Sequence, residues 1–280
     1  MRRPNSSDMQ TEINPRTLLG RTVNILQKAI FPSKCYVCNL LYHPAAKTIG
    51  KPASMSGHFA QLMDRFLCPA CAQDFIPIES PMCIQCGYLF KSREGGDHLC
   101  GACLATPRRF AAARAAGVYD STLTAVIHRF KYQAKIEMSE PLGYLLWNTF
   151  RQHWKEKDID LIVPVPLHRR RLRKRGFNHA HLIIKEWCRM VPEIAMPRIA
   201  KKNILERTRC TEPQTTLGSK QRLVNIKNAF RVREGSTVID KRILLLDDVY
   251  TTGATANECA RVLTKAGAKQ VDVLTLARAI

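Results

Sequence analysis

The distribution of apolar residues along the chain predicts strands and helices that alternate through its second half. Apolar runs of strand length occur at residues 112–119, 159–165, 198–202, 229–232, 243–246 and 271–276, of which 198–202 is the weakest. In the runs at 159–165 and 243–246 the apolar residues do not alternate with polar ones, which is typical of strands buried on both faces. Apolar residues at helical spacing follow several of these runs, at residues 122–130, 180–188 and 256–266, the last closed by Gly267. This order predicts an α/β fold with a mostly parallel sheet covered on both faces.

Two further features precede this α/β region. Apolar residues at mostly helical intervals in residues 17–30 predict an amphipathic helix that packs ahead of a cysteine-rich segment. A chain of 280 residues is longer than one typical domain requires. We therefore expect an N-terminal tail and helix at 1–30, a cysteine-rich region at 31–108, and a larger α/β domain at 109–280.

The cysteines change the picture by adding metal chemistry. Four CxxC pairs are present, and they are Cys35/Cys38, Cys68/Cys71, Cys83/Cys86 and Cys100/Cys103. Two such pairs on tight turns can present four sulfurs to one tetrahedral ion, so the four pairs predict a double zinc-ribbon region with two structural zinc ions. The alternatives are a disulfide framework or thioredoxin-like redox chemistry of a single pair. No apolar segment typical of a secretory signal or long enough to span a membrane is found, so we expect a cytoplasmic, reducing location that favours zinc.

The spacing of the cysteines leaves their pairing open. Sequential pairing would join the first two pairs at one ion and the last two at another, and interleaved pairing is also compatible. The gap at 39–67 contains Pro and Gly and is typical of an exposed insertion. Three histidines in the region could each replace a ligand, namely His43, His58 and His98. Of the remaining cysteines, Cys188 and Cys259 lie in helical patterns and are expected in the core, and Cys210 is assigned no chemistry.

The clearest candidate for ligand binding is the stretch ILLLDDVYTTGAT at 243–255. Its apolar residues predict a buried strand that ends at Asp247 and Asp248, and a turn rich in Thr and Gly leads into the next helix. Backbone N–H groups in such a turn favour a phosphate, and carboxylates at the carboxyl end of a strand can accept hydrogen bonds from adjacent hydroxyls. The predicted ligand therefore has vicinal hydroxyls and a phosphate. The structural alternative is a capping box in which Thr255 and Glu258 start the helix.

The excess of basic residues in the chain also predicts a polyanionic partner. The 44 Lys and Arg residues exceed the 23 Asp and Glu residues, and a formal charge of +21 attracts polyphosphates, nucleic acid or acidic membranes. Six cations crowd together after the strand at 159–165, and they are Arg169, Arg170, Arg171, Arg173, Lys174 and Arg175. Their mutual repulsion favours an anionic partner. A basic and aromatic cluster at 128–132 can either stack on single-stranded nucleic acid or form a solvated helix end.

Residues 243–255 resemble the ribose-5-phosphate-binding signature of the type I phosphoribosyltransferases, which has an apolar run, two acidic residues and a phosphate turn. By this resemblance Asp247 and Asp248 hold the ribose of phosphoribosyl pyrophosphate (PRPP) and position it for catalysis. The residues implied at its 5-phosphate are Thr251, Thr252, Gly253, Ala254 and Thr255. The residues implied at its pyrophosphate are Pro166, Leu167, His168 and Arg169. The resemblance implies Mg²⁺ on the pyrophosphate.

The polar segment at 206–227 is long for a packed connection, and we expect it to act as a lid over the site. It resembles the flexible loop of the glutamine-dependent PRPP amidotransferases. The positions that match that loop are Gln214 and Arg222.

Several motifs occur together in one order: FPxxC at 31–35, the CxxC pairs, RFKY at 129–132, VPVPLHRRRLRKRGFNHA at 163–180, TxxQ at 211–214 and DDVYTTGAT at 247–255. This ordered set is similar to the ComF (ComFC) family from about residue 18 to the C-terminus. The resemblance implies zinc ribbons joined to a PRPP-binding phosphoribosyltransferase fold, with a role in natural competence, single-stranded DNA handling and contact with other competence proteins. Expected contacts to the DNA backbone are Arg170, Arg171, Arg173, Lys174, Arg175 and Lys131. The alternatives are a non-catalytic nucleic-acid binder that uses PRPP or a nucleotide as effector, and one whose phosphate turn is vestigial.

Overall fold

The computed structural model describes residues 32–44, 54–92, 94–133, 135–190, 204–209, 219–234 and 236–280. At its centre is a four-stranded sheet with the strand order β3-β8-β7-β4. The strands are β3 (Ala113–Val118), β4 (Leu161–Pro164), β7 (Arg242–Tyr250) and β8 (Gln270–Arg278), and each neighbouring pair is parallel. The predicted α/β class with a parallel sheet is therefore confirmed.

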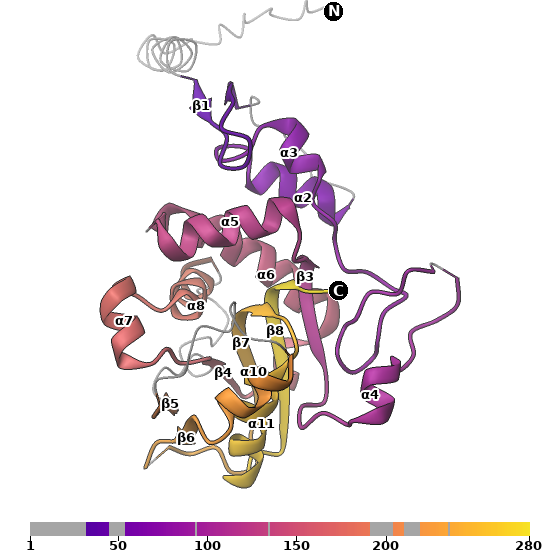
Figure 1. Cartoon of the computed structure of the whole chain (residues 1–280), viewed down its shortest axis with the longest axis vertical. Coiled ribbons are helices and arrows are strands. Elements are labelled where there is room, and N and C mark those ends of the chain that lie inside the picture. The colour runs from indigo at the N-terminus through magenta and orange to yellow at the C-terminus, as the bar shows by residue number, and fades with distance from the viewer. Residues whose placement is uncertain are drawn as a thin grey trace, which may run out of the picture.

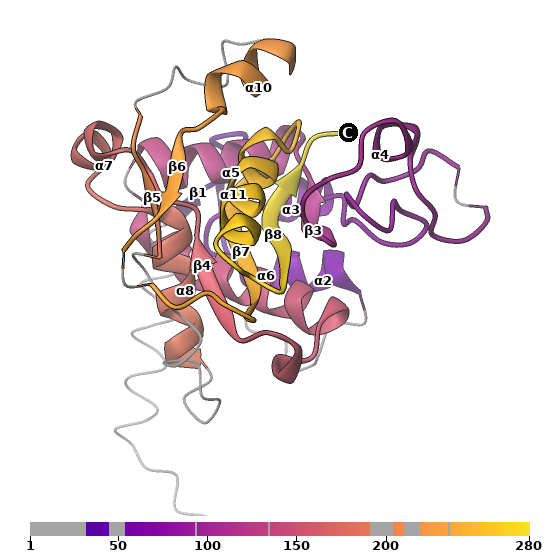
Figure 2. The same cartoon turned by 90° about the horizontal axis from the view of Figure 1, so that it is seen from below.

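Helices cover both faces of this sheet (Figures 1 and 2). On one face, side chains such as Leu244 and Leu246 of β7 share a core with α5 (Ser121–Tyr132), α6 (Ser139–His153) and α8 (His179–Met190). On the other face, Ile243 and Leu245 pack with α11 (Ala254–Lys265). This alternation follows from the strand repeat, in which successive side chains point to opposite faces.

Helices α5, α8 and α11 were predicted from the sequence, whereas α6 was not. Helix α6 is flanked by two single 3₁₀ turns, η1 (Ile136–Met138) and η2 (Glu156–Asp158). Its Trp147 and Phe150 pack against Trp187 of α8, with ring centroids 5.3 and 5.7 Å apart. The predicted core role of Cys259 is confirmed, because this residue is fully buried. The side chain of Cys188 and the whole of Cys210 lie outside the described residues, as does the helix predicted at 17–30.

The strand predicted at 229–232 is present as β6 (Phe230–Val232), but it lies outside the main sheet. It pairs antiparallel with β5 (Leu205–Arg207) in a separate two-stranded sheet. Most of strand β5 and all of helix α10 (Ser219–Ile226) fall within the segment predicted to be a polar lid, so most of its described residues have regular structure. The weak strand predicted at 198–202 lies outside the described residues.

The cysteine-rich region contains β1 (Ser33–Lys34), β2 (Leu41–Tyr42), α2 (Met55–Leu62), α3 (Pro69–Gln73) and α4 (Gly101–Ala105). The gap between the first two cysteine pairs was predicted to be an exposed insertion, and this is wrong for residues 54–67. Ser54 caps α2 by accepting a hydrogen bond from the Gly57 N–H at 3.1 Å. Phe59 of α2 is fully buried and stacks on Phe75 at 4.0 Å, within the core shared with α6. Burial of this apolar helix face outweighs the Pro and Gly signal that precedes it.

The basic stretch after β4, for which no regular element was predicted, forms the short helix α7 (Arg169–Arg175). His168 caps its N-terminus, with Nδ1 accepting a hydrogen bond from the Arg170 N–H at 3.3 Å. Gly176 ends the helix with φ of 82°. None of the helices in the described residues is both long and apolar enough to cross a membrane.

Candidate functional site

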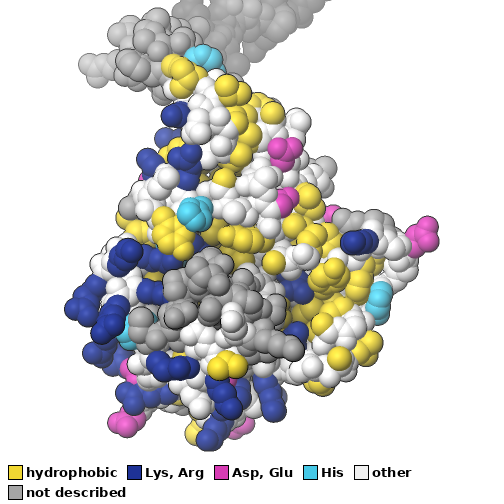
Figure 3. Space-filling model, in the orientation of Figure 1, with side chains coloured by type: hydrophobic (Ala, Val, Ile, Leu, Met, Phe, Trp, Pro, Cys, Tyr) yellow, Lys and Arg dark blue, Asp and Glu magenta, His cyan; other side chains and the backbone are white. Residues whose placement is uncertain are grey.

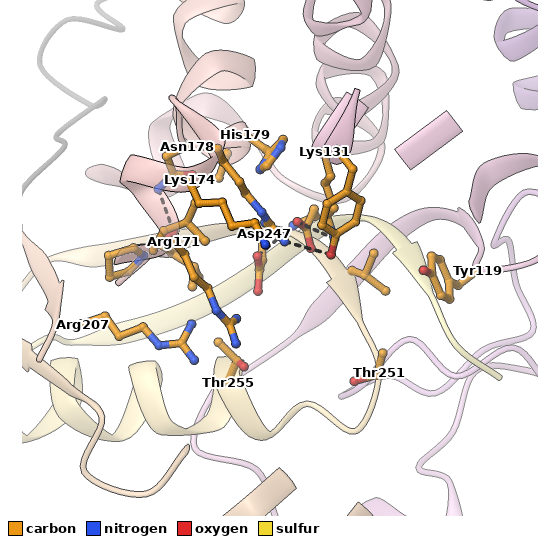
Figure 4. A pocket seen from close by; sticks show the side chains of 18 residues that line it. Tyr119, Lys131, Arg171, Lys174, Asn178, His179, Arg207, Asp247, Thr251 and Thr255 are labelled. Carbon is orange, nitrogen blue, oxygen red and sulfur yellow. Dashed lines mark hydrogen bonds and ion pairs between the residues drawn. The ribbon is translucent and has the colours of Figure 1, made fainter. Parts of the chain in front are cut away.

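The carboxyl ends of three parallel strands open onto one cavity of about 680 Å³ (Figure 4). Tyr119 enters it after β3, Pro166 and Leu167 after β4, and the segment from Asp247 to Thr255 at the end of β7 and the start of α11. This edge of an open parallel sheet is where such folds bind ligands, because loops and helix N-termini converge there. The cavity is large enough for a sugar phosphate.

Asp247 and Asp248 both line the cavity, although they occupy adjacent positions of β7. The Asp247 carboxylate accepts the Asp248 N–H at 2.9 Å. Asp248 forms an ion pair with Lys131 of α5, with Oδ2 and Nζ separated by 2.7 Å. Both residues are only partly exposed, so their charges influence each other strongly.

The two carboxyl groups differ in their affinity for a proton. Burial, reinforced by the negative charge of Asp248, raises the pKa of Asp247 to about 7. Burial also opposes ionisation of Asp248, but the Lys131 ammonium outweighs it and lowers the pKa of Asp248. Paired acids with separated pKa values are typical of functional sites. The cavity therefore contains one carboxylate with a fixed charge and one that titrates near neutral pH.

The turn after β7 has the geometry expected of a phosphate site. Gly253 is the N-cap of α11 and has φ of 76°, a conformation that favours glycine. Thr251 and Thr255 line the main cavity, and together with Gly253 and Ala254 they also line a small hollow beside it. Because the cap is Gly253, the alternative in which Thr255 caps the helix in a capping box is wrong. Thr252 lines neither hollow and accepts a hydrogen bond from the Ala254 N–H at 3.4 Å.

Helix α7 divides the basic run into two sets. Arg171, Lys174 and Arg175 recur at helical spacing and line the cavity. The other three are exposed and do not line it, and they are Arg169, Arg170 and Arg173. Figure 3 shows Lys and Arg side chains gathered on the side of the molecule that carries α7. The structure thus places three of the α7 residues assigned to DNA at the cavity, and places Arg169, assigned to pyrophosphate, outside it.

Two more cations reach the cavity from other elements. Lys131 comes from α5 and Arg207 from β5, and Arg171 and Arg207 both extend towards Thr255 (Figure 4). With the three cations of α7, five cationic side chains and two carboxylates line the cavity. This excess of positive charge suits a ligand with several negative charges.

The segment between β4 and α7 also lines part of the cavity. Pro166 and Leu167 line the cavity as predicted from the resemblance, whereas His168 does not and instead caps α7. The Asn178 side chain fixes this segment by donating from Nδ2 to the Val165 carbonyl oxygen at 3.0 Å. Gln214 lies outside the described residues, and of Arg222 only the backbone, within α10, is described.

The residues missed by sequence reasoning come from separate elements of the chain: Tyr119, Tyr132, Asn178, His179 and Arg207. Arg207 belongs to the segment already expected near the site, and Tyr132 to the basic and aromatic cluster. His179 is 2% exposed, and burial lowers its pKa to about 4, so its imidazole is neutral at physiological pH. No pattern in the sequence pointed to Tyr119.

The eight cysteines of the CxxC pairs form two clusters. One consists of Cys35, Cys38, Cys68 and Cys71 and is called the first cluster; the second cluster consists of Cys83, Cys86, Cys100 and Cys103. The sulfur atoms of each cluster all lie within 4.8 Å of one another. Sequential pairing is therefore correct, and the histidines considered as replacements belong to neither cluster in the described residues.

The geometry of both clusters fits zinc. Tetrahedral coordination at a Zn–S distance of about 2.3 Å places sulfurs about 3.8 Å apart. The Cys38 and Cys68 sulfurs are 3.7 Å apart, and those of Cys86 and Cys100 are 3.6 Å apart. Backbone N–H groups of Cys86 and Cys100 each donate to the Cys83 sulfur at 3.4 Å, which favours its thiolate form. A set of four thiolates is a closed site, so the zinc at each cluster is structural.

The first cluster is attached to the α/β domain through α5. Arg129 donates from Nε to the Tyr36 carbonyl oxygen at 2.6 Å and from Nη2 to Asn39 Oδ1 at 3.0 Å. Phe130 is fully buried. The basic and aromatic residues at 128–132 therefore have different roles. Arg129 binds the zinc ribbon of the first cluster, Phe130 is part of the core, and Lys131 pairs with Asp248 in the cavity.

Comparison with known proteins agrees with these features. Residues 60–104 match the double zinc ribbon domain family. Competence protein F of Haemophilus influenzae is 32% identical over 217 residues, which is 76% of this chain and 90% of the relative. The DNA utilization protein YhgH of Escherichia coli (strain K12) is 29% identical over 258 residues, covering 89% of this chain and 98% of the relative. Competence protein ComFC of Bacillus subtilis is 31% identical over 166 residues, covering 59% of this chain and 63% of the relative. With its double zinc ribbon, its parallel sheet and these relatives, the chain belongs to the competence protein F (ComF/ComFC) family.

Proposed function

We propose that the cavity at the carboxyl edge of the sheet binds PRPP as its complex with Mg²⁺. The observation that carries this proposal is the meeting of two carboxylates, a glycine-capped helix N-terminus and five cations around one cavity. Each part matches a part of the ligand. Carboxylates accept hydrogen bonds from ribose hydroxyls, the turn and helix N-terminus bind the 5-phosphate, and the cations surround the pyrophosphate.

The residues have distinct roles in this proposal. Asp247 and Asp248 hold the ribose, and the turn of Thr251 to Thr255 receives the 5-phosphate. The cavity-facing cations of α7, together with Pro166 and Leu167, surround the pyrophosphate. Mg²⁺ bound to the pyrophosphate would reduce the charge that these cations must neutralise. Lys131 is paired with Asp248 in the free protein and must share that carboxylate with the ribose.

The reaction that fits this arrangement is transfer of a phosphoribosyl group. The bond from the anomeric carbon to the pyrophosphate oxygen breaks, the electron pair leaves with pyrophosphate, and a bond forms from that carbon to a nucleophilic acceptor. Arg171, Lys174 and Arg175 are placed to stabilise the charge that develops on the leaving pyrophosphate. This chemistry depends on positioning and electrostatics and requires no protein nucleophile.

We further propose a role in natural competence and in handling single-stranded DNA in the cytoplasm. Relatives named competence protein F and DNA utilization protein support this role. The exposed cations of α7, which are Arg169, Arg170 and Arg173, are available for a DNA backbone and lie on the same short helix as the cavity cations. Binding through such contacts is largely independent of sequence and weakens with salt.

Calorimetric titration with PRPP and Mg²⁺ tests the site. Wild-type protein is expected to bind, and Asp247→Asn and Asp248→Asn are each expected to weaken binding by at least about tenfold, since each removes a charged acceptor for a ribose hydroxyl. Asp160→Asn is the matched control, because Asp160 lies at the amino end of β4, where it pairs with Arg242. Wild-type affinity in both cavity variants would refute the assignment.

A second candidate function keeps the site and removes the reaction. Because α7 carries both cavity cations and exposed cations, PRPP could act as an effector that changes affinity for single-stranded DNA. Pyrophosphate release from PRPP in the presence of a base, nucleoside or DNA acceptor would establish the transferase. Binding of PRPP that changes DNA affinity without any release would establish the effector function.

A further inference from the structure

A buried arginine links the second cluster to the strand that leads into the phosphate turn. Arg278, the last residue of β8, is 6% exposed. Its Nη2 donates to the Cys86 sulfur at 3.1 Å, and its guanidinium carbon lies 4.4 Å from the centre of the Tyr250 ring. Arg278 and Tyr250 are register partners in the β7–β8 pair. One side chain therefore contacts both a zinc ligand and the residue immediately before the turn.

Tyr250 packs directly against the phosphate turn at Gly253. It is 4% exposed, and a Cβ added to Gly253 would lie 2.2 Å from its hydroxyl oxygen. That hydroxyl has no hydrogen-bond partner among the described residues. The ring is therefore held by packing, against the Arg278 guanidinium and edge-to-face against Phe110 at 6.1 Å. Any shift of the ring changes the space available to the glycine that caps α11.

The charge of the second cluster accounts for the burial of Arg278. Four thiolates around one Zn²⁺ carry a net charge of about −2, and a buried cation is unfavourable without such a counter-charge. Two further nitrogens of Arg278, Nε and Nη1, have no hydrogen-bond partner among the described residues. The cluster sulfur and the faces of Tyr250 and Tyr88 are thus the groups that compensate the guanidinium.

The second zinc ribbon, which is the segment at 83–103 that carries the second cluster, also lies directly against the sheet. In Figure 1 the segment that carries α4 lies on the side of the sheet where β3 is the edge strand. The Ala113 N–H of β3 donates to the Gln85 carbonyl oxygen at 2.7 Å, and a Cβ on Gly87 would lie 2.6 Å from the Ala113 carbonyl oxygen. The backbone of the segment that carries the second cluster is therefore in direct contact with β3, and closely packed groups transmit displacements to one another.

We propose that Arg278 is a positioning residue that couples the second cluster to the phosphate turn, so that affinity for a phosphate ligand depends on the intact zinc–thiolate cluster. This inference rests on the proposed function, because the ligand of the turn is the 5-phosphate of PRPP. Coupling is reciprocal, so a bound ligand also slows loss of zinc from the second cluster. The first cluster contacts α5 through Tyr36 and Arg129 and is not coupled to the turn in this way.

Arg114 offers a matched control. It also binds the second ribbon, donating from Nη1 to the Ile84 carbonyl oxygen at 3.0 Å. However, its register partner in β8 is Leu274, and this hydrogen bond is made to a backbone oxygen instead of a cysteine sulfur.

The experiment compares full-length, zinc-loaded Arg278→Met and Arg114→Met with wild type. In Arg278→Met, amide hydrogen exchange of residues 250–257 is expected to accelerate and PRPP affinity to fall on the order of tenfold, within the usual range for coupled sites. In Arg114→Met both are expected to stay close to wild type.

The two proposals fail separately in this experiment. If wild type binds PRPP but exchange at the turn and affinity are alike in the two variants, the coupling is wrong and the proposed function stands. If wild type does not bind PRPP but exchange at the turn accelerates only in Arg278→Met, the coupling stands and the proposed function is wrong.

A measurement on wild type needs no substitution and covers the case in which Arg278→Met does not fold. A chelator removes zinc while hydrogen exchange is followed in the second ribbon, at 83–103, and at the turn. Faster exchange at the turn as zinc leaves this ribbon, and slower zinc release when PRPP is present, support the coupling. Loss of zinc from the second ribbon with unchanged exchange at the turn would overturn it.

Discussion

Replacing Asp247 with Asn is expected to stabilise the free protein at alkaline pH while it weakens PRPP binding. Burial and the neighbouring charge of Asp248 raise the pKa of Asp247 to about 7. In the unfolded chain its pKa returns to about 4. Between these values the folded state binds more protons at this group than the unfolded state, so stability decreases as pH rises. Asn cannot ionise and therefore escapes this cost, and its Oδ1 can still accept the Asp248 N–H.

The magnitude follows from the two pKa values. A tenfold change in proton affinity is worth about 1.4 kcal/mol, so the difference in protonation of Asp247 between the folded and unfolded states destabilises the fold by up to roughly 4 kcal/mol at pH 8 and roughly 2 kcal/mol at pH 5.5. The stability advantage of Asp247→Asn over wild type is thus expected to grow by up to roughly 2 kcal/mol between these pH values. The lower limit of pH 5.5 keeps the zinc ligands deprotonated.

Urea unfolding followed by tryptophan fluorescence measures this difference, because Trp147 and Trp187 are buried in the core. Asp160→Asn is the control with the opposite sign. The Arg242 guanidinium lowers the pKa of Asp160, so its contribution to stability is fully present at both pH values and its loss destabilises the protein equally at both. An Asp247→Asn variant that is less stable than wild type at pH 8, or whose advantage does not grow with pH, would contradict this account of the site.

Three further variants test other parts of the site. Gly253→Ala places a Cβ at a φ of 76° and against a tyrosine hydroxyl, so thermal unfolding is expected to show a loss of about 1–3 kcal/mol together with loss of PRPP binding. Lys131→Met removes the ammonium group 2.7 Å from the Asp248 carboxylate and leaves that largely buried charge without its partner, so urea unfolding is expected to show a loss of stability of about 2–3 kcal/mol. Unchanged stability would mean that the ion pair is absent in solution. Arg170→Gln combined with Arg173→Gln removes two exposed cations of α7, so the slope of log affinity for single-stranded DNA against log salt should decrease by about 1.4, whereas an unchanged slope would exclude these contacts.

Much of the framework follows from local pattern. The apolar runs identify β3, β4, β7 and β8, and helical spacing identifies α5, α8 and α11, because a strand or helix buried in a sheet domain must repeat its apolar residues at the period of that element. The CxxC spacing identifies zinc ligands for a similar reason, since both sulfurs of a pair come from one turn. Gly253 and Gly267 both have positive φ, of 76° and 95°, so the glycines at the two ends of α11 mark its limits.

The tertiary structure alone decided which of these elements meet. Lys131 lies 117 positions before Asp248, and Arg278 lies 192 positions after Cys86, yet each pair is in contact. Periodicity describes which face of an element is buried, but it carries no information on which distant side chain approaches that face, because such contacts depend on the packing of whole elements. The sequence by itself thus determined the four strands of the main sheet, the zinc ligands and the glycine-capped turn after β7. Packing decided the pairing of the cysteines within each cluster, the two sets of cations on α7, and the contact of Arg278 with both Cys86 and Tyr250.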